Sequence, residues 1–337
     1  MQDRLIFLIG PPRSGSTLLT RMLGAHSAIH SPVEPHLLTP LAHLGYYAKV
    51  ERADYDPIIA QQGIRAVVQS LPQGESQYLD ALRAYTDAIY RGLLESSGRQ
   101  RLLDKTPAYG LVLDFAEKIY PRARYVVLTR NPLAVWSSYV NSFFDGDHAV
   151  AYAHNPLLER YVPAMGRFLR ETRVEHCHVR YEELVQSPRE QMQHVCQFLD
   201  LPFEEEMIEY GRSEGGQTES ARGLGDPVTV AKESRPTTRS VARWVEDYAG
   251  QAEGVALAQQ ILAKLTDEDL GTWGFSRNEI EADLARVDTA AAARRTRPLS
   301  RYTLERWLLV RLRRNIHRNA FGRLVRKLRE ACDVLLR

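Results

Sequence analysis

Residues 10–19 (GPPRSGSTLL) combine glycine, hydroxyl and guanidinium groups at a spacing that could bind a phosphate. They fit the pattern G-x-x-x-x-G-K-[ST] at every position except one, because Ser16 stands where the lysine is expected. In such a loop, successive backbone N–H groups and the N-terminus of the following helix point at the anion. Gly15 would let the backbone approach closely, and Ser16 and Thr17 would add hydroxyl donors. The pattern predicts a loop for a phosphate ester, with Arg13 supplying positive charge.

A second candidate anion site begins at Arg130, which follows the apolar segment 124–129 (RYVVLT). β-Branched and aromatic residues make this segment a predicted strand, and Pro132 favours a helix that runs to about residue 142. A guanidinium presents a planar fork of donors to phosphate oxygens. Ser138, eight residues after Arg130, could reach the same anion from the helix.

The elements that must position these residues alternate between strands and helices. Such an alternation, with strands that are apolar throughout, predicts an α/β fold around a parallel sheet. The main predicted strands are 5–9, 101–104, 124–129 and 176–181, and the main predicted helices are 16–23, 132–142, 157–172 and 188–199.

Residues 12–19 (PRSGSTLL) resemble the 5′-phosphosulfate loop of sulfotransferases that use 3′-phosphoadenosine 5′-phosphosulfate (PAPS). This variant of the loop is similar to that of the tyrosylprotein sulfotransferases and their bacterial relatives. Arg130 and Ser138 match the family's second signature, which binds the 3′-phosphate. The likeness covers roughly residues 4–275. It implies a P-loop-type three-layer fold and the in-line transfer of a sulfuryl group from PAPS to a hydroxyl or phenol acceptor, with release of 3′,5′-ADP.

The resemblance also implies which residues bind the nucleotide and which act on the acceptor. Glu34, in the segment SPVEPHLL, matches the general base of the protein-sulfating branch. Lys105, in LDKTP, matches a lysine that contacts the sulfate or its leaving group, although Asp104 replaces the family's asparagine. The implied catalytic residues are Glu34, Arg13 and Lys105, and the implied nucleotide-binding residues are Arg13, Ser14, Gly15, Ser16, Thr17, Arg130, Ser138, Tyr181 and Arg243.

Several alternatives remain open at this stage. His30 and His36 flank Glu34 and are rival general bases. A P-loop kinase or NTPase without its lysine is the alternative function, and it would need magnesium and an acidic strand end, for which Asp104 is the best candidate. In a sulfotransferase, protein cations would serve that role, so no metal is expected. His26 and His30 are four residues apart but have no third ligand nearby, which argues against zinc.

Composition restricts the class of protein further. The chain has 337 residues, of which 44% are hydrophobic and 26% charged, as in a folded globular protein. It contains no uninterrupted apolar run of about 18 residues and begins without the pattern of a secretory signal. Three scattered cysteines suit a reducing compartment. We therefore expect a cytoplasmic protein, with peripheral membrane association as an alternative.

The net charge of +2 hides an asymmetry between the two ends of the chain. Residues 277–337 contain 16 basic and 7 acidic side chains, whereas the rest is acidic, which argues against nucleic acid as a partner. We expect a sulfotransferase domain over 1–276 and a basic amphipathic helical tail over 277–337. Within the domain, 36–100 would form a helical insertion or cap and 211–238 a mobile loop.

The acceptor and the tail partner are the least determined features. The segments expected to choose the acceptor contain no readable motif, so a small molecule, a lipid, a glycan and a peptide all remain candidates. In residues 300–337, apolar side chains recur on one helical face between arginines. This segment could pack on the domain, form a homodimer contact, or lie on an anionic membrane surface.

Overall fold

The computed structural model describes residues 1–48, 56–212 and 234–289. A five-stranded sheet lies at the centre of this described part, in the order β2-β3-β1-β4-β5. Every strand pair is parallel, so the predicted α/β fold with a central parallel sheet is confirmed. The strands are β1 (Leu5–Ile9), β2 (Ile29–His30), β3 (Arg101–Lys105), β4 (Arg124–Thr129) and β5 (His176–Arg180).

The central strand β1 is buried on both faces of the sheet. Its side chains alternate between the two faces, so Leu5, Phe7 and Ile9 enter one hydrophobic cluster. Ile6 and Leu8 enter the other. An uninterrupted apolar pentapeptide is what a strand covered on both sides requires, and this is why the sequence predicts β1 so clearly.

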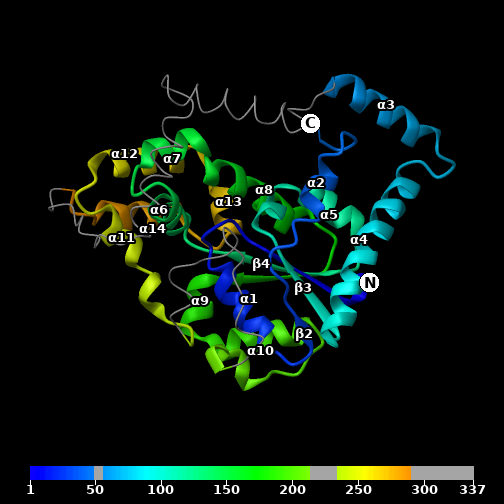
Figure 1. Ribbon diagram of the computed structural model, residues 1–337. Helices are drawn as coiled ribbons and strands as arrows, with labels where there is room; N and C mark the ends of the chain where they lie inside the picture. The colour runs from blue at the N-terminus through cyan, green and yellow to red at the C-terminus, as the bar shows by residue number, and fades with distance from the viewer. Residues whose placement is uncertain (49–55, 213–233, 290–337) are drawn as a thin grey trace, which may run out of the picture.

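Helices cover both faces of the sheet, which gives three layers (Figure 1). The smaller cluster lies under α1 (Ser16–Gly24), α9 (Tyr181–Gln186) and α10 (Pro188–Phe198). The larger cluster lies under α4 (Glu75–Ser97), α5 (Leu113–Ile119), α6 (Pro132–Phe143), α8 (Leu157–Glu171), α12 (Ala252–Lys264) and α13 (Asp267–Thr272). The main predicted strands and helices are all present, with ends that differ by a residue or two.

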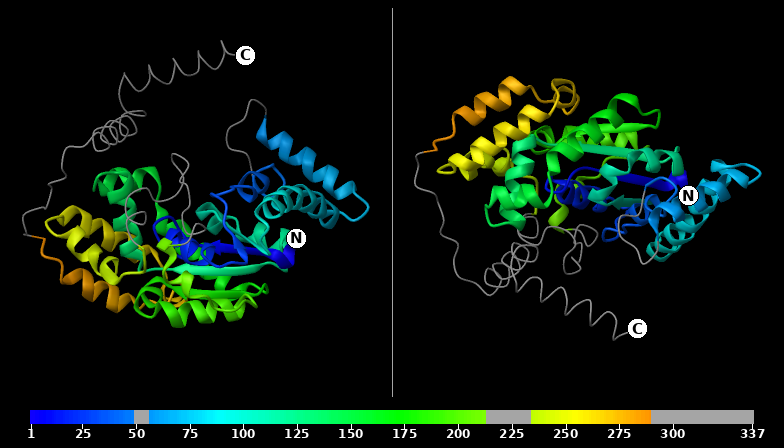
Figure 2. Two further views of the ribbon diagram at one scale, coloured as in Figure 1. Left: turned by 60° about the horizontal axis from the view of Figure 1, so that its bottom comes forward. Right: turned by 90° about the horizontal axis from the view of Figure 1, so that it is seen from above.

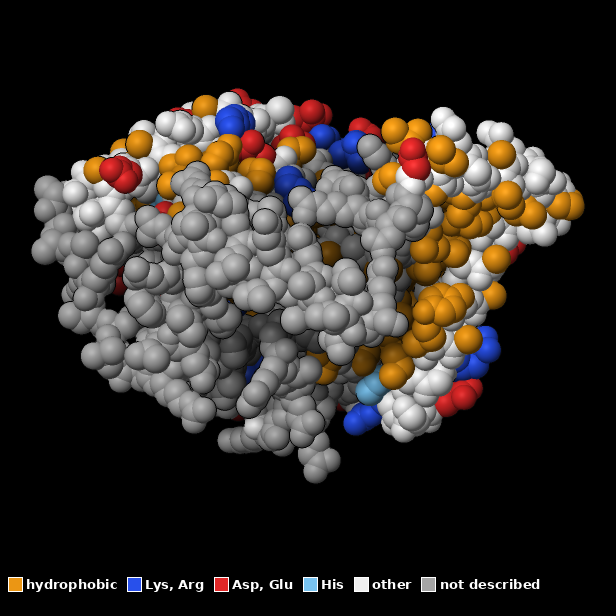
Figure 3. Space-filling model, turned by 45° about the horizontal axis from the view of Figure 1, so that its top comes forward, with side chains coloured by type: hydrophobic (Ala, Val, Ile, Leu, Met, Phe, Trp, Pro, Cys, Tyr) orange, Lys and Arg blue, Asp and Glu red, His pale blue; other side chains and the backbone are white. Residues whose placement is uncertain are grey.

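Residues 36–100 contain α2 (Leu38–Ala42), α3 (Pro57–Ser70) and α4 in the described part of the chain. Figure 2 shows α3 and α4 at one end of the molecule, with α12 and α14 (Arg277–Ala285) at the opposite end. Val68 is the one buried residue of α3. Hydrophobic side chains gather on the face that carries this helix (Figure 3), and Ile58 and Ile59 are 55% and 66% exposed.

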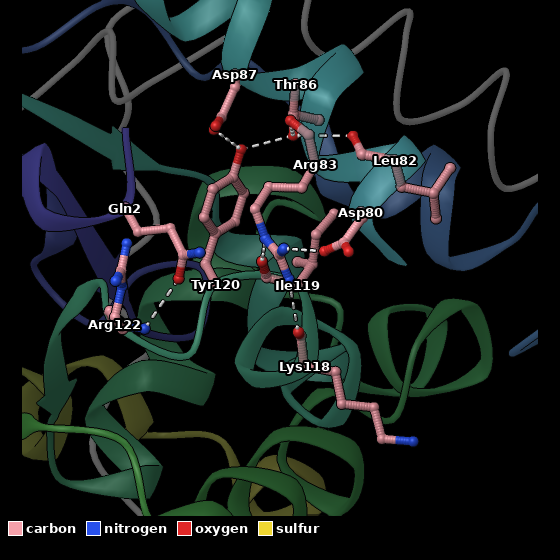
Figure 4. Close-up of polar contacts among 10 residues, drawn as sticks. All are labelled: Gln2, Asp80, Leu82, Arg83, Thr86, Asp87, Lys118, Ile119, Tyr120 and Arg122. Atoms are coloured by element: carbon pink, nitrogen blue, oxygen red, sulfur yellow. Dashed lines mark hydrogen bonds and ion pairs between the residues drawn. The ribbon is translucent and has the colours of Figure 1, made fainter. Parts of the chain in front are cut away.

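The longer helix α4 is fixed to the body by polar contacts at the junction of α5 and β4 (Figure 4). The Tyr120 hydroxyl donates a hydrogen bond of 2.8 Å to Asp87 and lies 2.6 Å from the Thr86 hydroxyl. Arg83 donates to the carbonyl oxygens of Ile119 and Lys118. Thr86 and Tyr120 are thereby buried with their hydrogen-bond partners. Helix α4 is anchored to the body, whereas α3 before it buries one residue.

At the other end, α14 lies in the range that the sequence assigns to the tail. It packs against α12 and places Ile280 and Leu284 in the larger hydrophobic cluster. Residues 290–337, with the amphipathic segment 300–337, lie outside the described residues, as does most of the predicted loop 211–238. Within the described ranges, no helix is both long and apolar enough to cross a bilayer.

Candidate active site

The loop between β1 and α1 has the backbone shape of an anion-binding turn. Arg13 and Gly15 have positive φ angles of 71° and 95°, and the Ser14 N–H donates to the Pro11 carbonyl oxygen over 3.2 Å. Helix α1 begins at Ser16, directly after Gly15. The loop therefore leads into a helix N-terminus, where free N–H groups and the helix dipole favour a bound anion.

Gly15 is required for two separate reasons. Its φ of 95° disfavours any residue with a Cβ, and a Cβ would lie 2.4 Å from Cδ2 of Tyr181. Tyr181 begins α9, next to the end of β5, and packs its ring against the loop backbone. The sequence predicts Tyr181 near the nucleotide, and the structure brings its ring to the loop.

Arg130 follows β4 and is 8% exposed. Its Nη1 donates over 3.1 Å to the Arg13 carbonyl oxygen, and its Nη2 donates over 2.6 Å to the Ser240 carbonyl oxygen. The guanidinium lies 4.3 Å from the centre of the Tyr181 ring. Burial lowers the pKa of Arg130 from its ordinary value, although a guanidinium keeps its charge at neutral pH.

Ser138 lies on the second turn of α6, a helix whose start is well specified. The Asn131 side chain caps it by accepting from the N–H groups of Leu133 and Ala134, and Pro132 occupies its first turn. The Ser138 hydroxyl accepts a hydrogen bond of 3.1 Å from Arg13 Nε. The two predicted phosphate motifs, 125 residues apart in sequence, therefore meet through Arg13.

Two buried polar atoms at this place have no hydrogen-bond partner in the described part of the protein. They are the hydroxyl of Ser14 and Nε of Arg130. Orphaned buried donors are costly, and a ligand that supplies acceptors would satisfy them. The donor set of guanidinium, hydroxyl and loop N–H groups fits phosphate oxygens.

Glu34 and Lys105 form a second group at the same edge of the sheet. Lys105 ends β3, and its ammonium donates to Oε1 of Glu34. The side chains are 8% and 12% exposed for Lys105 and Glu34, respectively. His36 Nε2 lies 3.4 Å from Glu34 Oε2. The sequence left His30 and His36 equal as rival bases, and the structure brings His36 to Glu34, whereas His30 lies in β2.

Arg243 occupies a more exposed position than the other candidate residues. It begins α11 (Arg243–Tyr248), is 64% exposed, and its Nε lies 3.9 Å from an oxygen of Asp247. The other oxygen of Asp247 accepts a hydrogen bond of 2.8 Å from the Ser137 hydroxyl. The predicted role of Arg243 in binding the nucleotide stays a prediction.

Sequence reasoning missed Glu182, which lies directly after Tyr181. Its Oε1 accepts a hydrogen bond of 3.0 Å from the Asn131 N–H, and its Oε2 is a buried oxygen without a partner in the described residues. This contact joins the start of α9 to the start of α6. The motif VRYEEL contains Glu182, but its contact with another strand end is not visible in the sequence.

The described residues contain no group of three or more His, Cys, Asp or Glu side chains that could hold a metal ion. The site places Arg13 and Arg130 at a glycine loop, with Lys105 on the neighbouring strand β3, at the carboxyl edge of a parallel sheet. Open α/β sheets bind their ligands at this edge. Fold and site together define an α/β protein with a phosphate-binding loop.

The chain belongs to the sulfotransferase family. The sequence profile of that family matches residues 5–205, which include the loop, Glu34, Lys105, Arg130, Ser138 and Tyr181. The family resemblance predicted from the motifs is therefore confirmed.

The chain is also similar to individual proteins. The chain is 33% identical over 266 residues to "Nodulation protein NoeE" of Sinorhizobium fredii (strain NBRC 101917 / NGR234), which covers 71% of this chain and 59% of that protein. It is 25% identical over 270 residues to a "Putative protein-tyrosine sulfotransferase" of Caenorhabditis briggsae, covering 73% and 82%. A solved "Sulfotransferase Domain from the Curacin Biosynthetic Pathway" is 24% identical, with a TM-score of 0.49, over 76% of this chain and 96% of that one. The chain spans about three fifths of NoeE.

Proposed function

We propose that this protein is a sulfotransferase that moves a sulfuryl group from PAPS to a hydroxyl or phenol acceptor and releases 3′,5′-ADP. The observation that carries the proposal is the meeting of two anion-binding motifs, the β1–α1 loop and the end of β4, through Arg13. Arg130 Nη1 donates to the Arg13 carbonyl oxygen, and Arg13 Nε donates to Ser138. PAPS carries phosphate on both its 5′ and its 3′ side and so needs two such motifs. Family membership disfavours the kinase alternative.

The two ends of the nucleotide would bind to different residues. The N–H groups of the loop, with the hydroxyls of Ser14, Ser16 and Thr17, would hold the 5′-phosphosulfate. Arg130 and Ser138 would hold the 3′-phosphate, for which Arg130 would give up one of its carbonyl contacts. The Tyr181 ring would support the loop, and Arg243 would contact a phosphate from α11.

Transfer would proceed as an in-line displacement at sulfur. The acceptor oxygen forms a bond to sulfur while the bond between sulfur and the 5′-phosphate oxygen breaks, and that oxygen keeps the electron pair. Glu34 takes the proton of the acceptor hydroxyl. Lys105 and Arg13 stabilise the charge that develops on the leaving oxygen and the sulfuryl group. Protein cations would replace the magnesium of kinases.

The nucleotide assignment is tested by calorimetry with 3′,5′-ADP, 5′-AMP and ATP, each with and without magnesium. We expect 3′,5′-ADP to bind most tightly and without metal. Arg130→Ala should weaken the binding of 3′,5′-ADP by about 10- to 100-fold, since hydrogen bonds to a charged group are lost. The binding of 5′-AMP should change little. Arg124→Ala, at the other end of β4, is the matched control because its ion pairs with Glu175 and Asp200 are on the surface. Equal binding of 3′,5′-ADP and 5′-AMP would contradict the assignment.

The acceptor class is the less specified part of the proposal. Candidate acceptors are small molecules, lipids, glycans and peptides with a free hydroxyl or phenol, and a screen with labelled PAPS would identify the class. The proposal also includes a cytoplasmic location, with or without association with the membrane surface. Residues 300–337 would contact either a second copy of the chain or an anionic membrane surface. Sedimentation with and without anionic vesicles would distinguish these two contacts.

A further inference from the structure

A buried carboxylate lies behind the Glu34–Lys105 pair. Asp104, on β3 directly before Lys105, is 0% exposed. Three hydroxyl groups surround it: those of Tyr90 and Tyr109 lie 2.6 and 3.1 Å from Oδ2, and that of Thr106 lies 3.0 Å from Oδ1. These partners come from α4, from the short helix η2 (Pro107–Leu111) and from the residue between β3 and η2.

Two of these hydroxyls connect Asp104 to the segment that follows Glu34. Thr106 Oγ1 accepts from the His36 N–H over 3.3 Å, and the Tyr109 hydroxyl accepts from the Leu38 N–H over 3.1 Å. A backbone N–H can only donate, so each hydroxyl accepts on one side and directs its own proton to Asp104. The carboxylate accepts both hydrogen bonds and thereby fixes the orientation of both hydroxyls.

The segment held in this way contains an unfavourable backbone conformation. His36 has a φ of 53°, in the left-handed region that residues with a Cβ seldom adopt. Such conformations persist where the surroundings determine them, and they cluster at functional sites. The turn through His36 also brings its imidazole to Glu34, whose other oxygen meets Lys105.

We propose that Asp104 is a positioning residue for the transfer reaction. Its ionised carboxylate acts through Thr106 and Tyr109 to hold the turn of residues 34–38, so that Glu34 faces Lys105. The inference rests on the proposed function, because it concerns the orientation of the proposed base. Burial raises the pKa of Asp104 to about 6, so the group is ionised at neutral pH in spite of its burial.

Two tyrosines provide a matched pair for the test. Tyr90 and Tyr109 both donate to the same oxygen of Asp104, but only Tyr109 also accepts from Leu38. Phenylalanine at either position removes one hydroxyl and leaves the ring. Tyr109→Phe should lower kcat about tenfold, because misplaced catalytic groups lose rate, while the KM for PAPS and the affinity for 3′,5′-ADP stay unchanged. Tyr90→Phe should keep kcat within about twofold of the natural protein on the same reasoning.

Thr106 offers a rescue experiment on the other oxygen of Asp104. Thr106→Val removes the acceptor of the His36 N–H and should lower kcat, whereas Thr106→Ser restores the hydroxyl and should recover most of it. Asp104→Asn keeps the shape but replaces an acceptor oxygen with a donor, so it should also lower kcat without a change in 3′,5′-ADP affinity.

A readout without turnover separates this inference from the proposed function. Hydrogen exchange of the Leu38 amide in the nucleotide-free protein should accelerate in Tyr109→Phe and stay unchanged in Tyr90→Phe. Equal effects of the two variants on exchange, or on kcat, would overturn the positioning role. Failure to bind 3′,5′-ADP with the expected exchange pattern intact would instead remove the proposed function, and the role of Asp104 in holding the turn would remain.

Discussion

The nucleotide side of the candidate site and the segment 36–100, which we propose as its acceptor side, differ in how they are packed. On the nucleotide side, the loop before α1 follows the buried strand β1. Arg130 follows the buried strand β4 and is itself 8% exposed. On the side of residues 36–100, α3 buries one residue and exposes several apolar ones. Phosphate binding requires fixed backbone geometry, which the end of a buried strand provides, whereas an exposed helix can vary in sequence at little cost to the fold. The comparison explains why motifs identify the donor and leave the acceptor open.

The largest expected effect concerns Glu34, where the two sides meet. Glu34→Gln should lower kcat by about 100- to 10,000-fold, because a general base is lost, and leave the affinity for 3′,5′-ADP unchanged. His36→Asn is the control, since asparagine tolerates the left-handed backbone of position 36. A larger loss in His36→Asn than in Glu34→Gln would show that the imidazole is the base.

Asp104 should give the protein a distinct pH dependence of stability. Its folded pKa of about 6 exceeds the ordinary 3.8, so the folded state binds the proton more tightly than the unfolded state. The contribution of Asp104 to the free energy of unfolding should therefore fall by about 2 kcal/mol as the pH rises from 4 to 6. The groups that face the carboxylate are Tyr90, Thr106 and Tyr109, with His36 nearby.

Denaturant titrations of the natural protein and of Asp104→Asn measure this dependence. The amide does not titrate, so its curve should lack the fall between pH 4 and pH 6. Identical slopes for both proteins in this range would assign the fall to other groups.

Two glycines, one from each side, provide the next contrast. Gly15→Ala should destabilise the protein by about 1–2 kcal/mol from the positive φ alone. It should also weaken the binding of 3′,5′-ADP, because the added Cβ would clash with the Tyr181 ring. Gly63, inside α3, has nothing within 4 Å of a built Cβ, so Gly63→Ala should stabilise by about 0.5–1 kcal/mol. Thermal unfolding and calorimetry would measure both, and a stabilising Gly15→Ala would refute the required loop geometry.

The smallest effect is expected on the open face of α3. Ile59, which is 66% exposed, should tolerate replacement by serine within about 0.5 kcal/mol. Val68 is 1% exposed on the same helix, so Val68→Ala should lower the free energy of unfolding by about 2 kcal/mol. If Ile59→Ser proved as costly as Val68→Ala, α3 would be packed on both faces, and the two sides of the site would differ less than described.

The sequence predicted most of the framework, since each long element carries its own periodic pattern. It did not predict β2, because two residues carry no pattern. It did not predict the solvent exposure of α3, because an apolar helical stripe has the same sequence pattern whether or not a partner covers it. At the site, Arg13, Arg130, Ser138 and Tyr181 were predicted together and the structure brings them together. Glu182 and the hydroxyls around Asp104 were missed, since their partners lie on other elements.

The sequence by itself determined the parallel α/β framework, the phosphate loop that has Ser16 in place of a lysine, and membership of the sulfotransferase family. These follow from local spacing, because strand burial, glycine backbone freedom and helix starts are properties of neighbouring residues. The tertiary structure alone decided which histidine lies beside Glu34, and that the hydroxyls of Thr106 and Tyr109, which donate to the buried Asp104, also accept from the turn of residues 36–38. The contacts of these hydroxyls with the turn connect residues about 70 positions apart, and only the folding of the chain sets the distance between them.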